Sequence, residues 1–259
     1  MNPTRTLEPS VPNPPDARPD PLIILPAGGP PAQLFILLHG ESAEPGQLMA
    51  LAAAIRSAFP QAVIIQPYGP FGDGGARRWI AEAAPDADAY VGLISAAATA
   101  VAADIAAWQG QHGLDGERTA LVGFSEGAAV ALDAVCSTPG LAGRAILFST
   151  RFATLPGDAP RTATLHLLHG AEDRIAPVDQ ARQVHAHLAA LQGDTTLDIA
   201  SGVGHDLHAA LIHQAIVRLQ TCVPLRLWEN AQGAPSLRID EYSADDPHPH
   251  PGPGPETLH

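Results

Sequence analysis

A serine between two glycines is the feature of this chain with the clearest chemical meaning. Ser125 is the central residue of the pentapeptide GFSEG, residues 123–127, which follows the apolar run 119–122 and opens the Ala-rich run 128–132. A G-x-S-x-G turn between a strand and a helix is strained, and its glycines let neighbouring backbone approach closely. The strain holds the serine hydroxyl where a substrate carbonyl can reach it. The context predicts that Ser125 is a nucleophile, with an ordinary turn serine as the alternative.

An acid and a histidine follow in the order that a catalytic triad on an α/β-hydrolase fold requires. Asp173 ends the polar loop after the apolar run 164–168, and His205 lies on a Gly-rich loop after the run 196–200. The order along the chain in that fold is serine, acid, histidine. We expect His205 to take the Ser125 proton and return it to the leaving group, while Asp173 fixes the imidazole tautomer.

The acid and the histidine also have alternative interpretations. Asp173 could cap the helix that follows it, and the adjacent Glu172 is a rival for the role of the acid. His205 could bind a metal together with His208 and His213, although no nearby carboxylate completes a recognisable zinc motif. The sequence therefore favours metal-free acyl transfer without a cofactor.

Acyl transfer also needs hydrogen-bond donors for the developing oxyanion. We expect one donor to be the backbone N–H of Glu126, directly after the nucleophile, and the other to be that of Glu41, after the first central strand and its His39-Gly40 end. A carboxylate near an oxyanion would repel it unless the side chain points away or is paired. Solvent-facing side chains at both positions are the simplest expectation.

Several short motifs together resemble the phospholipase/carboxylesterase family, to which acyl-protein thioesterases belong, and within it the small bacterial esterases of the YpfH type. The motifs are Leu38-His39-Gly40, Pro67-Tyr68-Gly69-Pro70, Arg78-Trp79, Gly123-Phe124-Ser125, His169-Gly170-Ala171-Glu172-Asp173 and Gly204-His205. The resemblance extends from about Leu34 to Gln220. It implies a serine hydrolase of carboxylic esters or thioesters with small to medium acyl groups and no cofactor.

The same resemblance identifies one pocket residue and two departures. Trp79 matches a family tryptophan near the mouth of the site, where an aromatic wall would contact the acyl chain, and a packing role is its alternative. Glu126 stands where the family usually has glutamine, and residues 41–44 replace a Gly-rich loop that often ends in aspartate. A peptidase or lipase on the same scaffold, or a binding protein on a degenerate hydrolase fold, remains the competing interpretation.

Apolar runs alternate with helical patterns along the chain, which predicts an α/β-hydrolase three-layer sandwich with a mostly parallel central sheet and no large lid. The expected strands are 34–38, 62–66, 119–123, 144–148, 163–168 and 196–200, with a possible edge strand at 22–25, and the expected helices are 45–58, 89–111, 125–137, 177–192 and 206–222. We expect a hydrolase domain over residues 22–243, a disordered proline-rich arm over 1–21 and a disordered Pro/His-rich tail over 244–259.

The composition of the chain limits the partners that it is expected to bind and the cellular compartment in which it is expected. The net charge is −13 and every cationic side chain is an arginine, which argues against nucleic acid and anionic membrane surfaces. Cys136 and Cys222 fit no metal or redox spacing, and the first twenty residues lack the apolar segment of a signal peptide. We therefore expect a cytoplasmic enzyme with a small-molecule substrate and no membrane span, since no apolar run approaches ~18 residues. A homodimer, with residues 224–242 in its contact, is left open.

Overall fold

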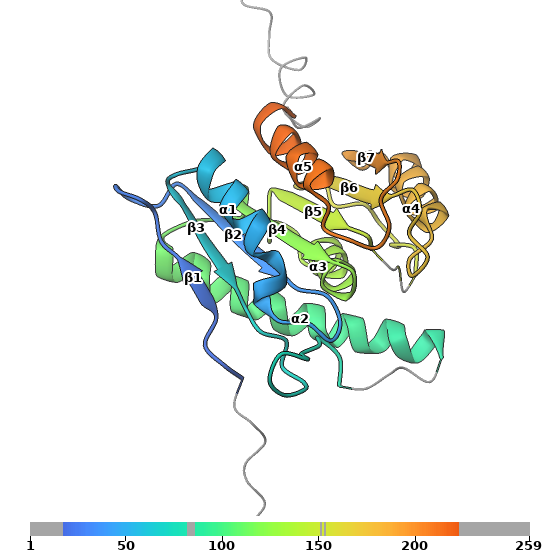
Figure 1. Cartoon of the computed structure of the whole chain (residues 1–259), viewed down its shortest axis with the longest axis horizontal. Coiled ribbons are helices and arrows are strands. Elements are labelled where there is room, and N and C mark those ends of the chain that lie inside the picture. The colour runs from blue at the N-terminus through green and yellow to red at the C-terminus, as the bar shows by residue number, and fades with distance from the viewer. Residues whose placement is uncertain (1–17, 82–85, 151, 153, 223–259) are drawn as a thin grey trace, which may run out of the picture.

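The core of the protein is a seven-stranded sheet, seen in a computed structural model that describes residues 18–81, 86–150, 152 and 154–222 (Figure 1). The strand order is β1-β3-β2-β4-β5-β6-β7, and only the β1–β3 pair is antiparallel within this sheet. The strands are β1 (Leu22–Ile24), β2 (Gln33–Leu38), β3 (Ala62–Gln66), β4 (Thr119–Phe124), β5 (Arg144–Phe148), β6 (Thr164–Gly170) and β7 (Thr195–Ala200). The predicted α/β fold with a mostly parallel sheet is confirmed.

Helices cover both faces of the sheet, which makes the three layers. They are α1 (Met49–Ala58), α2 (Ala87–His112), α3 (Glu126–Ser137), α4 (Val178–Ala190) and α5 (Ala209–Thr221), with short 3-10 helices at Pro45–Leu48 and Gly116–Arg118. Successive strand residues point to opposite faces. In β2, Leu34 and Ile36 belong to the core under α2, α3 and α4, whereas Phe35 and Leu37 belong to the core under α1 and α5. Burial on both faces explains why the strands are almost continuously apolar.

The helix α2 bears on the expectation that the chain has no membrane span, which stays a prediction. Over Ala87–His112 it is long and apolar enough to cross a membrane by length and composition, with a mean hydropathy of 1.6 over its best window. The sequence predicted this helix over 89–111, and the observed helix begins two residues earlier and ends one residue later. The buried side chains of α2, Ile94, Ala98, Val101 and Ile105, belong to the core beneath it.

The parallel strands bring the predicted site residues to one edge of the sheet. β2, β4, β6 and β7 end just before the loops that carry His39, Ser125, Asp173 and His205. Ligands of open α/β sheets bind at the carboxyl ends of the strands. The predicted tail 244–259 and the segment 224–242 lie outside the described residues, as does nearly all of the predicted arm.

Candidate active site

The turn at Ser125 is strained in the way that the pentapeptide predicts. Ser125 has φ 53° and ψ −116°, a region that residues other than glycine rarely adopt. Its backbone N–H donates to the carbonyl of Phe148 at the end of β5, at 2.9 Å. A Cβ at Gly123 would lie 2.4 Å from the Gly127 carbonyl oxygen, and one at Gly127 would lie 2.4 Å from two backbone oxygens of β2 and the residue after it. Only glycine fits at either side of the serine.

Three predicted residues from three loops form one hydrogen-bonded chain. His205 Nε2 lies 3.0 Å from Ser125 Oγ, and His205 Nδ1 lies 2.7 Å from Asp173 Oδ2. Because the carboxylate can only accept, Nδ1 carries the ring proton and Nε2 is free to accept the serine proton. The ring packs against Phe124, with centroids 4.9 Å apart. This geometry allows general-base activation of the hydroxyl.

The carboxylate of Asp173 is buried and held on both oxygens. Its Oδ1 accepts from the backbone N–H groups of Ile175 at 2.9 Å and Ala176 at 2.8 Å. Burial alone would raise the pKa of Asp173, but these hydrogen bonds and the one from His205 outweigh it and lower the pKa. The rival Glu172 is exposed and accepts instead from the backbone N–H of Gly202 at 3.0 Å. Of the two acids, only Asp173 contacts the histidine.

His169 supports the loop that carries this acid. Its Nε2 lies 2.7 Å from the Ala176 carbonyl and 3.3 Å from Asp173 Oδ2. Burial lowers the pKa of His169, so the ring is neutral near pH 7 and donates its Nε2 proton to the carbonyl. No sequence pattern shows that this ring lies against the acid.

The loop that carries the second predicted oxyanion donor is tight and held at both ends. Gly40 N–H donates to Gln47 Oε1 at 2.8 Å, and Ser42 has a positive φ of 54°. Ala43 exchanges two backbone hydrogen bonds with Arg77, at 3.1 and 2.9 Å. Glu41 lies between these supports with an exposed side chain. Its backbone N–H as an oxyanion donor stays a prediction, as does that of Glu126, which is the first residue of α3.

The side chain of Glu126 does not face solvent, which corrects the simpler expectation for this position. It is 4% exposed, and its Oε2 accepts from the backbone N–H of Trp79 at 2.6 Å. A charged carboxylate can be buried when it is hydrogen-bonded in this way. Glu126 therefore ties the turn at Ser125 to the irregular loop between β3 and α2, a contact that no local sequence signal shows.

The side chain of Trp79 adds further contacts near the turn at Ser125. It is 1% exposed, its Nε1 donates to the His39 carbonyl at 2.8 Å, and its ring lies 5.1 Å from the imidazole of His39. The structure thus places Trp79 as a packing residue against the end of β2 and His39, next to the loop of Glu41. Direct contact with an acyl chain at the mouth of the site stays a prediction and would need this side chain to be uncovered.

His39 lies beside Trp79, and its ring is neutral. Burial, the largest effect, lowers its pKa to about 4. Its Nε2 accepts from Gly69 N–H at 2.8 Å, and its Nδ1 donates to the Gly40 carbonyl at 2.7 Å. The nearby guanidinium of Arg77 is 4% exposed, and its Nε and Nη1 have no hydrogen-bond partner among the described residues. No sequence pattern pointed to Arg77.

The alternative metal site does not form around His205. Both ring nitrogens of His205 are engaged by Ser125 and Asp173, while His208 Nδ1 accepts from a backbone N–H at the start of α5, at 3.2 Å. Among the residues that the structure describes, no three His, Cys, Asp or Glu side chains gather as a metal site would require.

Known proteins share this fold and sequence pattern. The sequence model of the Phospholipase/Carboxylesterase family matches residues 20–223. Esterase YpfH of Escherichia coli (strain K12) is 31% identical over 204 residues, which are 78% of this chain and 88% of that protein. Esterase PE8 superposes with a TM-score of 0.71 at 26% identity, covering 79% of this chain and 99% of PE8. The Bacillus cereus carboxylesterase shares the fold, with a TM-score of 0.64 at 16% identity, over 76% of this chain and 91% of its own. The chain belongs to the phospholipase/carboxylesterase family and is a hydrolase of the carboxylesterase type.

Proposed function

We propose that this member of the phospholipase/carboxylesterase family cleaves carboxylic esters through an acyl-enzyme on Ser125. The observation that carries the proposal is the hydrogen-bonded chain from Ser125 Oγ through His205 to Asp173, with distances of 3.0 and 2.7 Å. Ser125 Oγ attacks the acyl carbon while His205 Nε2 takes its proton. His205 then gives the proton to the departing alkoxide, and a water molecule repeats the sequence to release the acid.

The oxyanion of each tetrahedral intermediate is assigned to two backbone N–H groups. The N–H of Glu126 starts α3, where the helix dipole also favours negative charge. The N–H of Glu41 follows the tight turn at the end of β2. Main-chain donors on supported loops need no reorganisation when the charge develops, and one such donor contributes about 3 kcal/mol to lowering the barrier.

Small to medium acyl groups and the corresponding thioesters are the substrates that we assign to this site. An acyl-enzyme mechanism serves esters and thioesters alike, because only the leaving group differs. The proposal needs no cofactor, since nucleophile, base and oxyanion donors all come from this chain. It also agrees with the assignment of this chain to the carboxylesterase-type hydrolases.

Replacement of the nucleophile tests the proposal. Ser125→Ala should lower turnover of p-nitrophenyl esters by a factor on the order of 10⁴ or more, and it should abolish labelling by a fluorophosphonate probe, with an unchanged circular dichroism spectrum. Ser201→Ala, in an exposed turn, is the matched control and should label like the wild type. Near-normal activity of Ser125→Ala would overturn the assignment. A panel of p-nitrophenyl esters and acyl-CoA thioesters then ranks the acyl groups and the two ester classes.

A further inference from the structure

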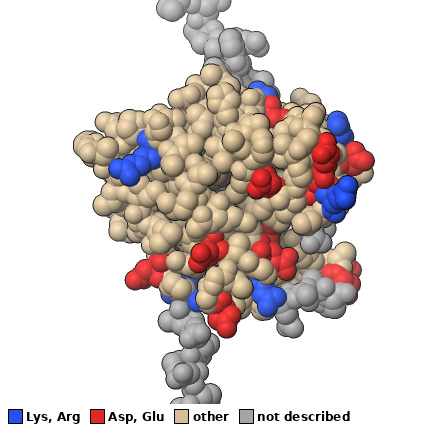
Figure 2. All heavy atoms as spheres, viewed as in Figure 1, with Lys and Arg blue, Asp and Glu red and all other residues tan. Residues whose placement is uncertain are grey.

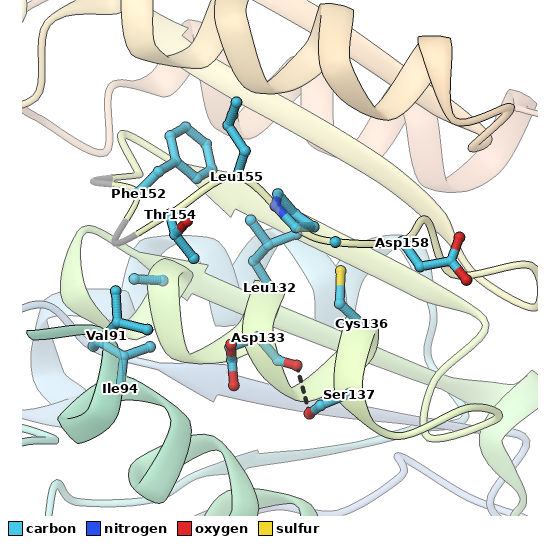
Figure 3. Close-up of a pocket in the computed structure, with 13 residues that line it drawn as sticks. Val91, Ile94, Leu132, Asp133, Cys136, Ser137, Phe152, Thr154, Leu155 and Asp158 are labelled. Atoms are coloured by element: carbon cyan, nitrogen blue, oxygen red, sulfur yellow. Dashed lines mark hydrogen bonds between the residues drawn. The ribbon is translucent and has the colours of Figure 1, made fainter. Parts of the chain in front are cut away.

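A cavity of about 230 Å³ lies beside the helix that begins at the proposed nucleophile (Figure 3). Its walls are the N-terminal half of α2 with Val91 and Ile94, one face of α3, and the loop after β5 with Phe152 and residues 154–158. In Figure 3, Phe152 and Leu155 lie on the loop across from α3. The volume is close to the range of small-ligand sites.

The cavity follows the helix face that starts at Ser125. Its α3 walls include Ala129, Leu132, Asp133 and Cys136, which come four, seven, eight and eleven residues after the serine. Residues at this spacing share one face of a helix. The loop that forms the opposite wall leaves β5 at Phe148, whose carbonyl accepts the Ser125 N–H. The near end of the cavity therefore lies one helical turn from the nucleophile.

One wall of this apolar space carries a carboxylate oxygen that lacks a partner. Asp133 Oδ2 is buried and accepts no hydrogen bond from any described residue. Burial raises the pKa of Asp133, and a hydrogen bond from Ser95 acts against it. A buried carboxylate oxygen without a donor is costly, and a plain hydrocarbon chain laid against it would not relieve that cost. A cationic hydrogen-bond donor would relieve that cost.

The other polar groups of the cavity do not compete for this role. Burial, with the charges of Asp133 and Asp158 adding to it, raises the pKa of Cys136 to about 12. The thiol is therefore protonated, neutral and inert at physiological pH. Asp158 is exposed, and its Oδ1 accepts from the backbone N–H of Ala159 at 2.8 Å. Asp133, which is partly buried, is thus the acidic side chain of this cavity with an oxygen that lacks a donor, and the net charge of −13 of the whole chain favours the approach of a cation.

We propose that this cavity binds the acyl group of the substrate and selects acyl chains that end in a protonated amine, which donates to Asp133. The proposal rests on the ester hydrolysis proposed above and names the acyl class of that site. Eight residues separate Ser125 from Asp133, roughly 12 Å along the helix. The aspartate side chain and its hydrogen bond cover about half of that, and an extended chain advances about 1.2 Å per bond. An ω-amino acyl group of about six carbons fits the remainder.

Paired substrates test the selectivity. The wild type should prefer p-nitrophenyl 6-aminohexanoate to p-nitrophenyl hexanoate in kcat/KM, and Asp133→Asn should lower that preference at least tenfold. Turnover of the hexanoate ester by Asp133→Asn should stay equal or rise. Asp179→Asn makes the same charge change on the exposed face of α4 and should leave the preference unchanged. A wild type that prefers the neutral ester, or an unchanged preference in Asp133→Asn, would refute the proposal.

A binding experiment separates this inference from the hydrolytic activity. Calorimetry on Ser125→Ala should show n-hexylammonium binding at least tenfold more tightly than 1-hexanol or hexanoate. Adding Asp133→Asn should remove that difference. If the wild type hydrolyses none of the esters but this pattern holds, the proposed reaction fails and the cavity assignment stands. Equal binding of the three ligands would sink the cavity assignment whatever the activity.

A steric variant tests whether the acyl chain enters the cavity at all. Ala129→Leu fills the end nearest Ser125, so kcat/KM for the hexanoate ester should fall at least tenfold while that for the acetate ester changes little. Ala54→Leu fills a separate groove between α1 and α5 and is the matched control. Equal losses for acetate and hexanoate would contradict the proposed path. If Ala129→Leu does not fold, the Asp133→Asn experiments still decide.

Discussion

Asp173 and Glu172 are adjacent carboxylates with different surroundings, and their variants should differ accordingly. Asp173→Asn puts an amide against His205 Nδ1, which favours the tautomer whose Nε2 cannot accept the serine proton, so turnover should fall about 10⁴-fold. Glu172→Gln keeps an acceptor for Gly202 N–H at the surface and should change kcat/KM by no more than about a factor of two. Steady-state kinetics on a p-nitrophenyl ester measure both, and the reverse ranking would move the acid to Glu172.

Glu126 should support the site through the hydrogen bond of its side chain. Its buried Oε2 accepts from the Trp79 N–H at 2.6 Å. Glutamine can still accept from this N–H, so Glu126→Gln should keep kcat/KM for a p-nitrophenyl ester near the wild-type value. Glu126→Ala leaves a buried donor without this partner and should lower the free energy of unfolding, measured by urea denaturation, by about 1–3 kcal/mol. Glu41→Ala removes an exposed carboxylate and is the control for stability. Equal stability of Glu126→Ala and wild type would show that this hydrogen bond has no structural role.

At the scale of single residues, the sequence predicts which residues form the site better than it predicts which residues contact one another. The order serine, acid, histidine needs only the chain, and the structure brings Ser125, Asp173 and His205 within hydrogen-bond distance. The Glu126–Trp79 hydrogen bond joins residues 47 positions apart through an irregular loop, so no periodicity or spacing reports it. The orphaned Asp133 oxygen depends on the side-chain packing of three elements, which is likewise invisible in a linear pattern.

At the scale of the elements, the turn at Ser125 packs so closely on β2 that one added methyl group should destabilise the fold. In Gly127→Ala the new Cβ would meet backbone oxygens of Leu38 and His39 at 2.4 Å, and backbone cannot move aside cheaply. We expect a loss of about 1–3 kcal/mol or more in the free energy of unfolding, measured by urea denaturation. A methyl group at Gly92, on the exposed side of α2, would have no atom within 4 Å, so Gly92→Ala should instead gain about 0.4–1 kcal/mol. Equal effects of the two substitutions would contradict the close approach.

The strands were easier to predict from the sequence than the ends of the helices and the direction of the edge strand. Buried parallel strands read as continuous apolar runs, and the run 34–38 matches β2 to within one residue. The expected helix over 206–222 begins later, at Ala209, because the His208 side chain caps it and residues 206–208 belong to the loop of His205. The antiparallel direction of β1 could not be predicted, since three residues carry no directional signal and its register against β3 is a tertiary choice.

For the molecule as a whole, the charge is strongly negative. On the face shown in Figure 2, most charged side chains lie near the right and lower edges, with acidic beside basic ones, and a broad uncharged area covers much of the rest. No lysine offers a flexible counterion, and the net charge of −13 comes from 27 acidic side chains against 14 arginines. Such a surface favours solubility near neutral pH and becomes less repulsive as carboxylates protonate in acid. Any loss of stability on mild acidification must therefore come from inside the protein.

Buried histidines should make the fold sensitive to mild acid. Burial lowers the pKa of both His39 and His166 from 6.5 to about 4. Between these pH values the unfolded chain binds more protons than the folded one, so the free energy of unfolding falls as pH falls through this window. Each ring should contribute a loss of about 2 kcal/mol between pH 8 and pH 5, and His169, whose pKa is also lowered, acts in the same direction.

A variant of one ring isolates the effect. His166→Asn can still bond to Thr196 Oγ1, the partner of the His166 Nδ1 at 2.8 Å, but it cannot take up a proton. Urea denaturation at pH 8, 6.5 and 5 should show a smaller acid loss in this variant, by about 2 kcal/mol at pH 5. His213→Asn replaces an exposed histidine on α5 and should leave the acid loss of the wild type unchanged. The explanation fails if wild type and His166→Asn lose the same free energy of unfolding between pH 8 and pH 5, because the buried ring would then be no source of the acid sensitivity.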